Sequence, residues 1–331
     1  MPEPKFDIVA IGNAIVDVIA QAEDELLVRA GLVKGEMQRL DGAGAARLYG
    51  MMGPAREISG GSGANTLAGM AMLGARCAFI GQVSDDQLGE VFAHDIRANG
   101  VAFDTPPRPG EPNTGHCLIL VTPDGERTMN TFLGASEFLP EAALDRALIA
   151  SAKILYLEGY LWDPLEPRAA MRAAIEVAHD AGNRVAFTLS APFVIERHRA
   201  DFRALIDGEK IDLLFANESE LLALVQGEDF EAAVAEIAAY VPILVVTRGA
   251  DGAIAVVHGV RHTIAAEPAD RIVDTTGAGD LFAAGFMAGF VRERSVEDCL
   301  RMGAIAAAEI ISHYGARPEA KLHELVKVRL G

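Results

Sequence analysis

The chain is built around one segment, which reads Asp274-Thr275-Thr276-Gly277-Ala278-Gly279-Asp280 and continues as Leu281-Phe282-Ala283-Ala284-Gly285-Phe286. The first half is small and rich in glycine. The second half predicts a buried helix, because Phe282, Phe286 and Phe290 recur at every fourth residue and so share one face. Gly285 and Gly289 lie between these aromatic residues, which favours close helix packing over intrinsic helix stability.

A glycine-rich loop that opens a helix leaves backbone N–H groups unpaired, and together with the helix dipole these groups attract anions. Gly277, Ala278 and Gly279 are therefore predicted to form an anion hole, to which the Thr276 hydroxyl contributes. Asp280 follows in the first turn, where a bound phosphate would repel it unless it had a role. We interpret Asp280 as the general base that takes a proton from an attacking hydroxyl. The alternative is a helix N-cap, a position that favours Asp in any case.

Two motifs resemble the signatures of the ribokinase family of carbohydrate and nucleoside kinases, the phosphofructokinase-B type. The segment 274–280 resembles the second signature. The first is resembled by Gly60-Gly61-Ser62-Gly63-Ala64-Asn65 followed by Gly81-x-Val83-x-Asp85-Asp86-x-x-Gly89. The turn at 60–65 is not a Walker loop, because no Gly-Lys-Ser/Thr follows, and its glycines are spaced wrongly for a dinucleotide fingerprint. The resemblance covers essentially the whole chain.

Composition limits the fold and the partners. The 331 residues are 50% apolar, which is enough for a large core. The formal net charge of −18 argues against nucleic acid or an anionic membrane as a partner. A small anionic ligand remains compatible with this charge, because a local nest of backbone amides can outweigh the global field.

Cysteine usage predicts a reduced, cytoplasmic protein. The three cysteines are far apart, odd in number and form no Cys-x-x-Cys, so we expect buried thiols rather than disulfides or a metal site: Cys77, Cys117 and Cys299. The apolar N-terminal run is interrupted by polar residues and lacks the charged start of a signal peptide. No run of about 18 apolar residues predicts a membrane span.

The order of predicted elements indicates an α/β fold. Strands and helices alternate regularly from Ala152 onward, which predicts a parallel sheet covered by helices. A hairpin of Thr114–Thr122 and Arg127–Leu133 interrupts the alternation and predicts a separate small sheet. With the family resemblance, we expect one ribokinase-like kinase domain over residues 1–331. It would be a three-layer α/β/α sandwich with a mainly parallel sheet and a β lid, inserted as segments of about residues 13–20, 36–41 and 112–134.

The lid segments carry the residues predicted to bind the acceptor. Asp17 lies in the middle of an apolar run that follows Gly12-Asn13, where Asp is unfavourable in a strand. It is either a solvated edge residue or a carboxylate that faces the ligand, and we favour the second. Asp17 and Asn13 would then bind a sugar, since a carboxylate can accept two hydrogen bonds from a vicinal diol. By the resemblance, the same sugar would be approached by Gly61, Ser62 and Asn65.

The resemblance also assigns an arginine and a nucleotide side. Arg127 matches an arginine that closes toward the reacting groups in relatives, the alternative being a solvated hairpin arginine. Asn217 and Glu220 match the family's Asn-x-x-Glu, which is linked to Mg²⁺ and phosphate through water, although the same pair fits a helix capping box. A turn resembles the one that approaches ATP, and its residues are Thr247, Arg248, Gly249 and Gly252. The plain alternative is a hairpin turn.

The family resemblance further implies a monovalent cation such as K⁺ near the anion-hole loop, with oxygens from Asp274, Thr276 and the turn after Ile311. Within the family, three stretches resemble the adenosine kinase subfamily: Gly12–Asp17, Thr188–Phe193 and Phe215–Glu220. Phe193 would then stack on the nucleobase, aided by Leu161 or Trp162. The alternative is that these aromatic residues belong to the core.

The resulting hypothesis is an ATP- and Mg²⁺-dependent kinase that phosphorylates the 5′-hydroxyl of adenosine. The first rival is a sugar kinase acting on ribose, fructose or another ketose. A rival of another class is a non-catalytic nucleotide-binding regulator, which an intact Asp280 disfavours. A dinucleotide-dependent oxidoreductase is distant, because no Gly-x-Gly-x-x-Gly follows the first strand. The expected partner is a small-molecule alcohol, and the chain would be a monomer or a homodimer formed through the lid.

Overall fold

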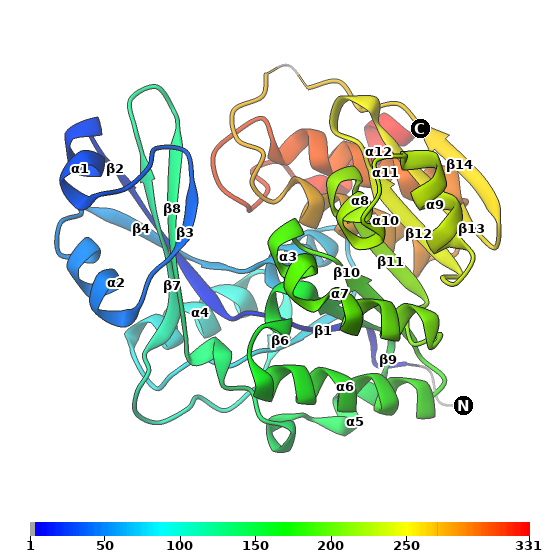
Figure 1. Ribbon diagram of the computed structural model, residues 1–331, viewed down its shortest axis with the longest axis horizontal. Helices are drawn as coiled ribbons and strands as arrows, with labels where there is room; N and C mark the ends of the chain where they lie inside the picture. The colour runs from blue at the N-terminus through cyan, green and yellow to red at the C-terminus, as the bar shows by residue number, and fades with distance from the viewer. Residues whose placement is uncertain (1–3, 270) are drawn as a thin grey trace.

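A computed structural model describes residues 4–269 and 271–331, and all predicted site residues fall within these ranges. The larger of its two sheets is drawn in Figure 1. Its strands lie in the order β14 (Val260–Ile264), β13 (Ala253–Val257), β12 (Ile243–Thr247), β11 (Leu213–Asn217), β10 (Arg184–Thr188), β9 (Ala152–Glu158), β1 (Phe6–Ile11), β5 (Cys77–Ile80) and β6 (Val101–Phe103). The run from β12 to β6 is parallel, and only β13 and β14 are antiparallel.

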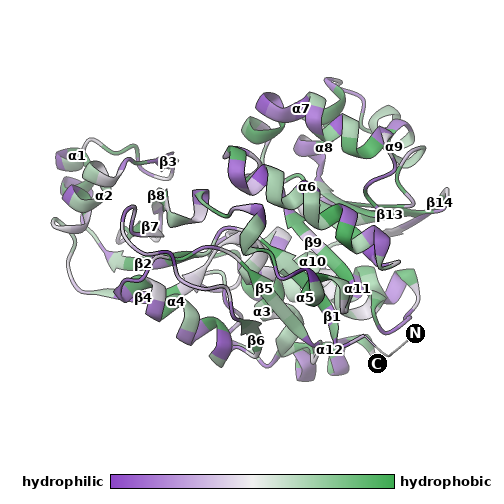
Figure 2. Cartoon of the chain, turned by 90° about the horizontal axis from the view of Figure 1, so that it is seen from below, coloured by the Kyte–Doolittle hydropathy of each residue, from purple (hydrophilic) through white to green (hydrophobic). Residues whose placement is uncertain are grey.

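Helices cover both faces of this sheet. In β1, Ile8 and Ala10 belong to one apolar cluster and Val9 and Ile11 to the other, because successive side chains point to opposite faces. The first cluster packs against α3 (Ser62–Met72), α4 (Gln87–Ala98), α10 (Ala278–Phe290), α11 (Val296–Ile310) and α12 (Leu322–Leu330). The second packs against α5 (Arg146–Ala150), α6 (Leu165–Asp180), α7 (Pro192–Asp207), α8 (Glu218–Val225) and α9 (Phe230–Ala238). Figure 2 shows α7, α8 and α9 on the opposite side of the sheet from α12, so the predicted three layers are confirmed.

The helix α10 packs as its glycines predict. A Cβ on Gly285 would collide with the backbone carbonyl of Met302 in α11, and one on Gly289 would lie 2.9 Å from Cys299 Sγ. The rings of Phe286 and Phe290 stack with centroids 6.3 Å apart. Close contact between α10 and α11 therefore depends on the two glycines.

The three cysteines, all within the described residues, are buried and free, which confirms the prediction of buried thiols.

The smaller sheet forms the lid, on the left in Figure 1. Its strands lie in the order β3 (Met37–Arg39), β8 (Arg127–Gly134), β7 (Thr114–Val121), β2 (Ile15–Gln21) and β4 (Ala55–Gly60). Its Val16, Val18, Leu118 and Leu120 pack in one cluster with α1 (Asp24–Ala30) and α2 (Gly42–Tyr49). The alternate residues Ile15, Asp17 and Cys117 line the cavity described below.

Several boundaries differ from the sequence prediction. The turn predicted at 60–65 is preceded by an unpredicted strand, β4, which ends at Gly60, pairs antiparallel with β2 and adds a strand to the lid. The helix α3 begins at Ser62, inside the predicted turn. The short elements α2, α5 and β6 were not predicted. None of the helices in the described ranges has the length and hydropathy needed to cross a bilayer.

Candidate active site

A cavity of about 1170 Å³ lies where the lid faces the large sheet. Five neighbouring strands of the large sheet contribute residues at or just beyond their carboxyl ends: Asn13, Glu158, Thr188, Asn217 and Thr247. Ligands of open α/β sheets bind at these strand ends, because the loops that follow them converge there. The segment 275–280 and the lid strands complete the wall.

Most of the residues predicted from the sequence line this cavity. They come from segments far apart in the chain: Asn13, Asp17, Gly61, Ser62, Asn65, Phe193, Asn217, Glu220, Thr247, Gly249, Gly252, Thr276, Gly277, Ala278, Gly279 and Asp280. The predicted residues that do not line it are Arg127, Arg248, Asp274, Leu161 and Trp162. The fold therefore brings the proposed acceptor and nucleotide residues to one continuous space.

Asp280 lies in the first turn of α10, and two side chains from the start of α3 hold its carboxylate. Ser62 Oγ donates to Oδ1 at 2.6 Å, and Asn65 Nδ2 donates to Oδ2 at 3.1 Å. Burial raises the pKa of Asp280, against the opposing effect of these two hydrogen bonds and of the nearby Arg317. Ser62 and Asn65, predicted to bind the acceptor sugar, thus orient the candidate base while also lining the cavity.

The loop before Asp280 has the properties of an anion site. Gly277 has φ +78°, and a Cβ there would lie 2.9 Å from the side chain of Ala316, so glycine is required on both conformational and steric grounds. Gly279 faces open space. Within the described residues, the backbone N–H groups of Gly277, Gly279 and Asp280 have no hydrogen-bond partner. These free donors at a helix N-terminus fit the phosphate oxygens of a nucleotide.

Asp17 faces the cavity and is not a solvated edge residue. Its strand β2 lies between β7 and β4, and its side chain is only 7% exposed. A Cβ on Gly60 would lie 2.6 Å from its carboxylate, so the glycine makes room for the acid. Burial raises the pKa of Asp17 to about 6, although Arg317 and Arg127 counteract this effect. The structure thus presents a buried carboxylate to a ligand in the cavity.

This raised pKa predicts a pH-dependent gain in stability for Asp17→Asn. In the folded chain Asp17 holds its proton up to about pH 6, whereas in the unfolded chain its pKa is the ordinary 3.8. The stability that the protonated group contributes is therefore fully present below pH 3.8 and is lost as the pH rises to about 6. Asparagine carries no charge, so at pH 8 the free energy of unfolding of the variant should exceed that of the wild type by roughly 2–3 kcal/mol. Thermal unfolding between pH 4 and pH 8 should show a gap that widens with pH.

The exposed Asp124, at the tip of the lid hairpin, provides the control, and Asp124→Asn should show no such gain. A difference between Asp17→Asn and the wild type that is constant across this pH range would contradict the burial of an ionised Asp17.

Glu158 is a cavity residue that the sequence analysis missed. It is fully buried at the end of β9 and accepts from Asn13 N at 2.8 Å, Asn13 Nδ2 at 2.5 Å and Gly63 N at 2.7 Å. Burial raises its pKa to about 7. It joins the end of β1 to the start of α3 and so fixes the amide of Asn13 at the cavity wall. The signal was an acid at the end of a buried strand, Leu157-Glu158-Gly159.

Arg127 does not line the cavity, which differs from the expectation for an acceptor-binding residue. Its Nη1 donates to Asp274 Oδ2, an oxygen that also accepts from Gly315 N at 3.0 Å. Asp274 Oδ1 accepts from Thr276 N at 3.0 Å. Burial of Asp274 is outweighed by these backbone N–H groups and by Arg127, which together lower its pKa. The pair joins the lid strand β8 to the anion-hole loop.

Asp274 was also expected to contribute to a monovalent cation site. The guanidinium of Arg127 already supplies a positive charge to its carboxylate. Among the described residues, no group of three or more His, Cys, Asp or Glu is arranged to hold a metal ion.

On the nucleotide side, Asn217 and Glu220 form a capping box at the start of α8 and also line the cavity, so the two interpretations are compatible. Burial raises the pKa of Glu220 to about 7. Arg248 does not reach the cavity. Its Nε donates to Glu218 at 2.9 Å, and its guanidinium lies 4.2 Å from the centroid of the Phe230 ring. These contacts turn Arg248 away from the space proposed for phosphate.

One wall of the cavity is aromatic. Tyr160 and Phe193 both line it, with ring centroids 6.2 Å apart, and Phe193 is 39% exposed. Trp162 and Leu161 were expected to help, but both are fully buried in the core. Trp162 packs edge-on against two phenylalanines of the core rather than facing the cavity. The slot is therefore formed by Tyr160 and Phe193.

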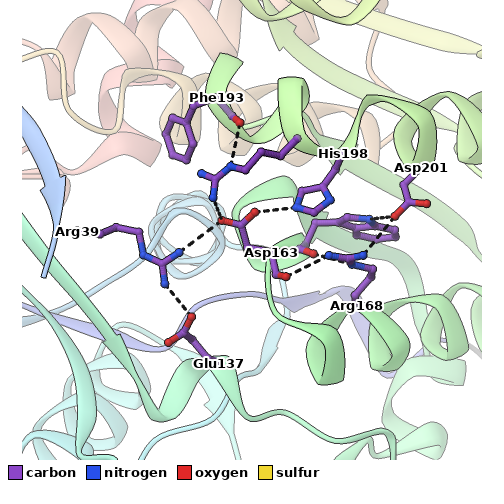
Figure 3. A network of polar contacts seen from close by, with 9 residues as sticks. Arg39, Glu137, Asp163, Arg168, Phe193, His198 and Asp201 are labelled. Atoms are coloured by element: carbon purple, nitrogen blue, oxygen red, sulfur yellow. Dashed lines mark hydrogen bonds and ion pairs between the residues drawn. The ribbon is translucent and has the colours of Figure 1, made fainter. Parts of the chain in front are cut away.

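A network of charged side chains lies beside Phe193 (Figure 3). Asp163 accepts from His198 Nε2 at 2.7 Å and pairs with Arg197 Nη1 at 2.9 Å. Arg39 reaches across from the lid strand β3, 3.5 Å from Asp163, and donates to Glu137 at 2.7 Å. This network gives the aromatic end of the cavity a polar border that includes both the lid and the large sheet.

Comparison with known proteins identifies the class. A family model described as pfkB family carbohydrate kinase matches residues 54–322. The chain is 27% identical to adenosine kinase 2 of Arabidopsis thaliana, over 93% of this chain and 94% of that protein. A solved adenosine kinase from Sinorhizobium meliloti is 44% identical with a TM-score of 0.91, and a probable sugar kinase from Rhizobium etli is 43% identical with a TM-score of 0.92. Each match covers 98% of this chain and 99% of the other.

The chain belongs to the pfkB family of carbohydrate kinases. Its fold is ribokinase-like, and it is a phosphotransferase that acts on an alcohol group. Membership implies ATP as the phosphoryl donor, typically with Mg²⁺. Relatives of similar identity carry the names of nucleoside kinases and of sugar kinases, so the acceptor has to be argued from the cavity.

Proposed function

We propose that this enzyme transfers the γ-phosphate of ATP to the 5′-hydroxyl of adenosine. The observation that carries the proposal is one cavity lined by a buried carboxylate of the lid, Asp17, and by an aromatic slot beside the large sheet, Tyr160 and Phe193. A nucleoside needs both features, because its ribose offers a vicinal diol and its base a flat apolar surface. The adenosine kinases among the relatives support the same choice.

Asp280 is the proposed base. Its carboxylate takes the proton from the 5′-hydroxyl, the resulting oxygen forms a bond to the γ-phosphorus, and the bond from that phosphorus to the β-γ bridging oxygen breaks to release ADP. The hydrogen bonds from Ser62 and Asn65 hold the carboxylate in place before the acceptor arrives. The free N–H groups of Gly277, Gly279 and Asp280 would bind the charge that develops on the phosphoryl oxygens, whereas the N–H of Ala278, also expected in the anion hole, donates to Thr275 O at 3.2 Å.

The nucleotide would lie between the anion-hole loop and the ends of β11 and β12. Thr247, Gly249, Gly252 and the pair Asn217 and Glu220 line that part of the cavity. Mg²⁺, when bound, would neutralise charge on the phosphates. Glu220 is the carboxylate at that end that could hold its water ligands, in keeping with the oxygen ligands that Mg²⁺ prefers.

One observation favours a sugar as the second candidate acceptor. The slot is bordered by polar side chains that could bind hydroxyls, among them Gln38, Arg39 and Asp163. However, these three already bond to protein groups: Gln38 to Asn130 at 2.8 Å, and Arg39 and Asp163 within the network of Figure 3. Because these side chains already bond to protein groups, they are less available to the hydroxyls of a sugar, and this favours the nucleoside.

Phe193→Ala separates the two acceptors. Loss of a stacking ring costs about 1–3 kcal/mol per base, so KM for adenosine should rise roughly 5- to 150-fold, with little change in kcat. Steady-state kinetics on the purified variant measure this change. The matched control is Tyr240→Ala, which removes an aromatic ring of similar exposure, also covered by an arginine but outside the cavity. An unchanged KM for adenosine in Phe193→Ala would remove the base from this slot.

The direct test is product analysis. Purified protein with ATP, Mg²⁺ and adenosine should form AMP and ADP in equal amounts, which chromatography resolves. Hydrolysis of ATP to ADP without AMP, or no reaction at all, would contradict the proposal.

A further inference from the structure

Arg317 lies between α11 and α12, in the turn after Ile311, and was not itself predicted to be a site residue. Its guanidinium bonds to residues of α3 and β4: Nη1 donates to Asn65 Oδ1, and Nη2 donates to Ser59 Oγ at 2.8 Å. Its Nε is buried and has no hydrogen-bond partner among the described residues. A buried donor without a hydrogen-bond partner costs stability, and that cost calls for a function.

The hydrogen bonds of Arg317 determine how Asn65 presents its amide. A guanidinium only donates, so the group that Asn65 turns toward it must be the carbonyl oxygen. The amide NH₂ is then directed to the other side, where it donates to Asp280 Oδ2. Ser59 is fixed in the same way, because its hydroxyl donates to Asp95 Oδ2 at 2.5 Å and accepts from Arg317. The chain of contacts therefore runs from Arg317 through Asn65 to Asp280.

We propose that Arg317 is a positioning residue of the phosphotransfer site, which orients Asn65 toward Asp280 and supplies the positive charge that keeps Asp17 and Asp280 ionised together. This inference deepens the proposed function and rests on it for the role of Asp280. The charge is needed because two carboxylates of one cavity repel each other, and burial adds to the cost of ionising both.

The surrounding charges leave Arg317 as the cation for this pair. The titratable groups on the elements around Asp17 and Asp280 are mainly acids and tyrosines. They are Asp17 and Asp95 from β2 and α4, Tyr156 and Glu158 from β9 with Tyr160 just after it, Glu220 from α8, and Asp274 and Asp280 around the anion-hole loop. Among the described residues, the other cation that acts on Asp17 is Arg127, which is bonded to Asp274, and the cavity residues Arg39 and Arg197 are paired with Glu137 and Asp163. Arg317 lowers the pKa of Asp17 and of Asp280, and arginine stays protonated even when buried.

The first test is the pH profile of kcat/KM for Arg317→Met and Arg317→Lys, with whichever acceptor the enzyme turns over. Without the charge, the acid limb should move up by about one pH unit, since a nearby opposite charge typically lowers the pKa of a carboxyl group by about 1–3 units. Lysine keeps the charge but loses the paired donors, so its profile should lie near that of the wild type while kcat stays reduced. Arg199→Met, which removes only a bond to the carbonyl of Ala223, is the control. Lower activity of Arg317→Met with an unmoved acid limb would overturn the proposal.

The second test needs no substrate. An aspartate with a raised pKa in the folded state destabilises the protein as the pH rises toward that pKa. Because Arg317 lowers the pKa of Asp17 and of Asp280, its removal should raise both values and extend the loss of stability to higher pH. The Tm deficit of Arg317→Met should therefore be larger at pH 8 than at pH 5, whereas a simple packing defect gives the same deficit at both. If Arg317→Met does not fold, Arg317→Gln replaces it.

The two tests separate the hypotheses. Absence of turnover with every acceptor, together with a deficit that grows with pH, would refute the proposed function and leave the charge role of Arg317 standing. Normal phosphorylation of adenosine by the wild type, with a deficit independent of pH in the variant, would refute Arg317 alone.

Discussion

Asp280→Asn should reduce kcat by roughly 10²- to 10⁴-fold, which is the usual contribution of a positioned general base. Asparagine keeps the size of the side chain and can still accept from Ser62 or Asn65, so folding should be preserved. It cannot take the proton of the acceptor hydroxyl. The N–H groups of the anion-hole loop do not change, and ATP should therefore bind with an affinity close to that of the wild type. Single-turnover kinetics and calorimetric titration of a nonhydrolysable ATP analogue measure the two quantities separately.

The matched control for this variant is Asp298→Asn. Asp298 also lies in the first turn of a helix, α11, where its ion-pair partner is Arg294 at 3.8 Å, but it lies outside the cavity. Its replacement should leave kcat unchanged. Turnover of Asp280→Asn within tenfold of the wild type would show that another group, or water alone, removes the proton.

Asp17→Asn should lower kcat/KM for adenosine roughly 10- to 150-fold. The estimate follows from the loss of hydrogen bonds to a charged acceptor, each worth about 1.5–3 kcal/mol. The wild type should lose a similar factor with 2′-deoxyadenosine or 3′-deoxyadenosine, because a buried carboxylate without its hydroxyl partner is costly. In the variant, the deoxynucleosides and adenosine should react at nearly equal rates. This double comparison of enzyme and substrate isolates the contact between Asp17 and the diol.

Asp124→Asn, on the same lid but exposed, should retain the full preference for adenosine over its deoxy analogues. If Asp17→Asn also keeps that preference, the diol is recognised elsewhere. The same substitution is expected to stabilise the protein at pH 8, as argued above. Lower activity with higher stability is the pattern of a residue kept for function at the expense of stability.

The fold was predictable where local pattern and global packing agree. The strand Phe6–Ile11 is apolar on both faces because helices cover both, and Gly285 and Gly289 mark the contact of α10 with α11. The strand β4 was missed because Arg56, Glu57 and the glycines after them are typical of a loop. Its pairing with β2 is a long-range contact, so only the tertiary structure reveals it.

The site was predictable to the extent that motifs mark it. The anion-hole loop, Asp17 and the Asn217–Glu220 pair reach the cavity as expected. The family resemblance predicted Arg127 and Arg248 at the site. Their long side chains instead form ion pairs with neighbouring carboxylates, Arg127 with Asp274 and Arg248 with Glu218. Trp162 was expected in the slot, and instead Tyr160, two residues earlier, faces the cavity while Trp162 turns into the core.

Glu158 and Arg317 show the opposite limit. Each is one charged residue in an unremarkable segment, and its importance lies in partners 95 to 258 residues away along the chain. The local pattern marks Glu158 only as an acid at the end of a buried strand and gives no sign of the partners of either residue, because these contacts exist only after the lid, α3 and the C-terminal segment have come together.

The central claim is that this enzyme phosphorylates a nucleoside and not a free sugar. The most direct test is an acceptor panel with the purified protein, in which ATP consumption is followed with Mg²⁺ and K⁺ for adenosine, other nucleosides, ribose, fructose and other ketoses. We predict that kcat/KM for adenosine exceeds that for every sugar by at least a hundredfold. Turnover with a sugar and not with adenosine would contradict the nucleoside assignment and the slot of Tyr160 and Phe193, while leaving the chemistry at Asp280 intact.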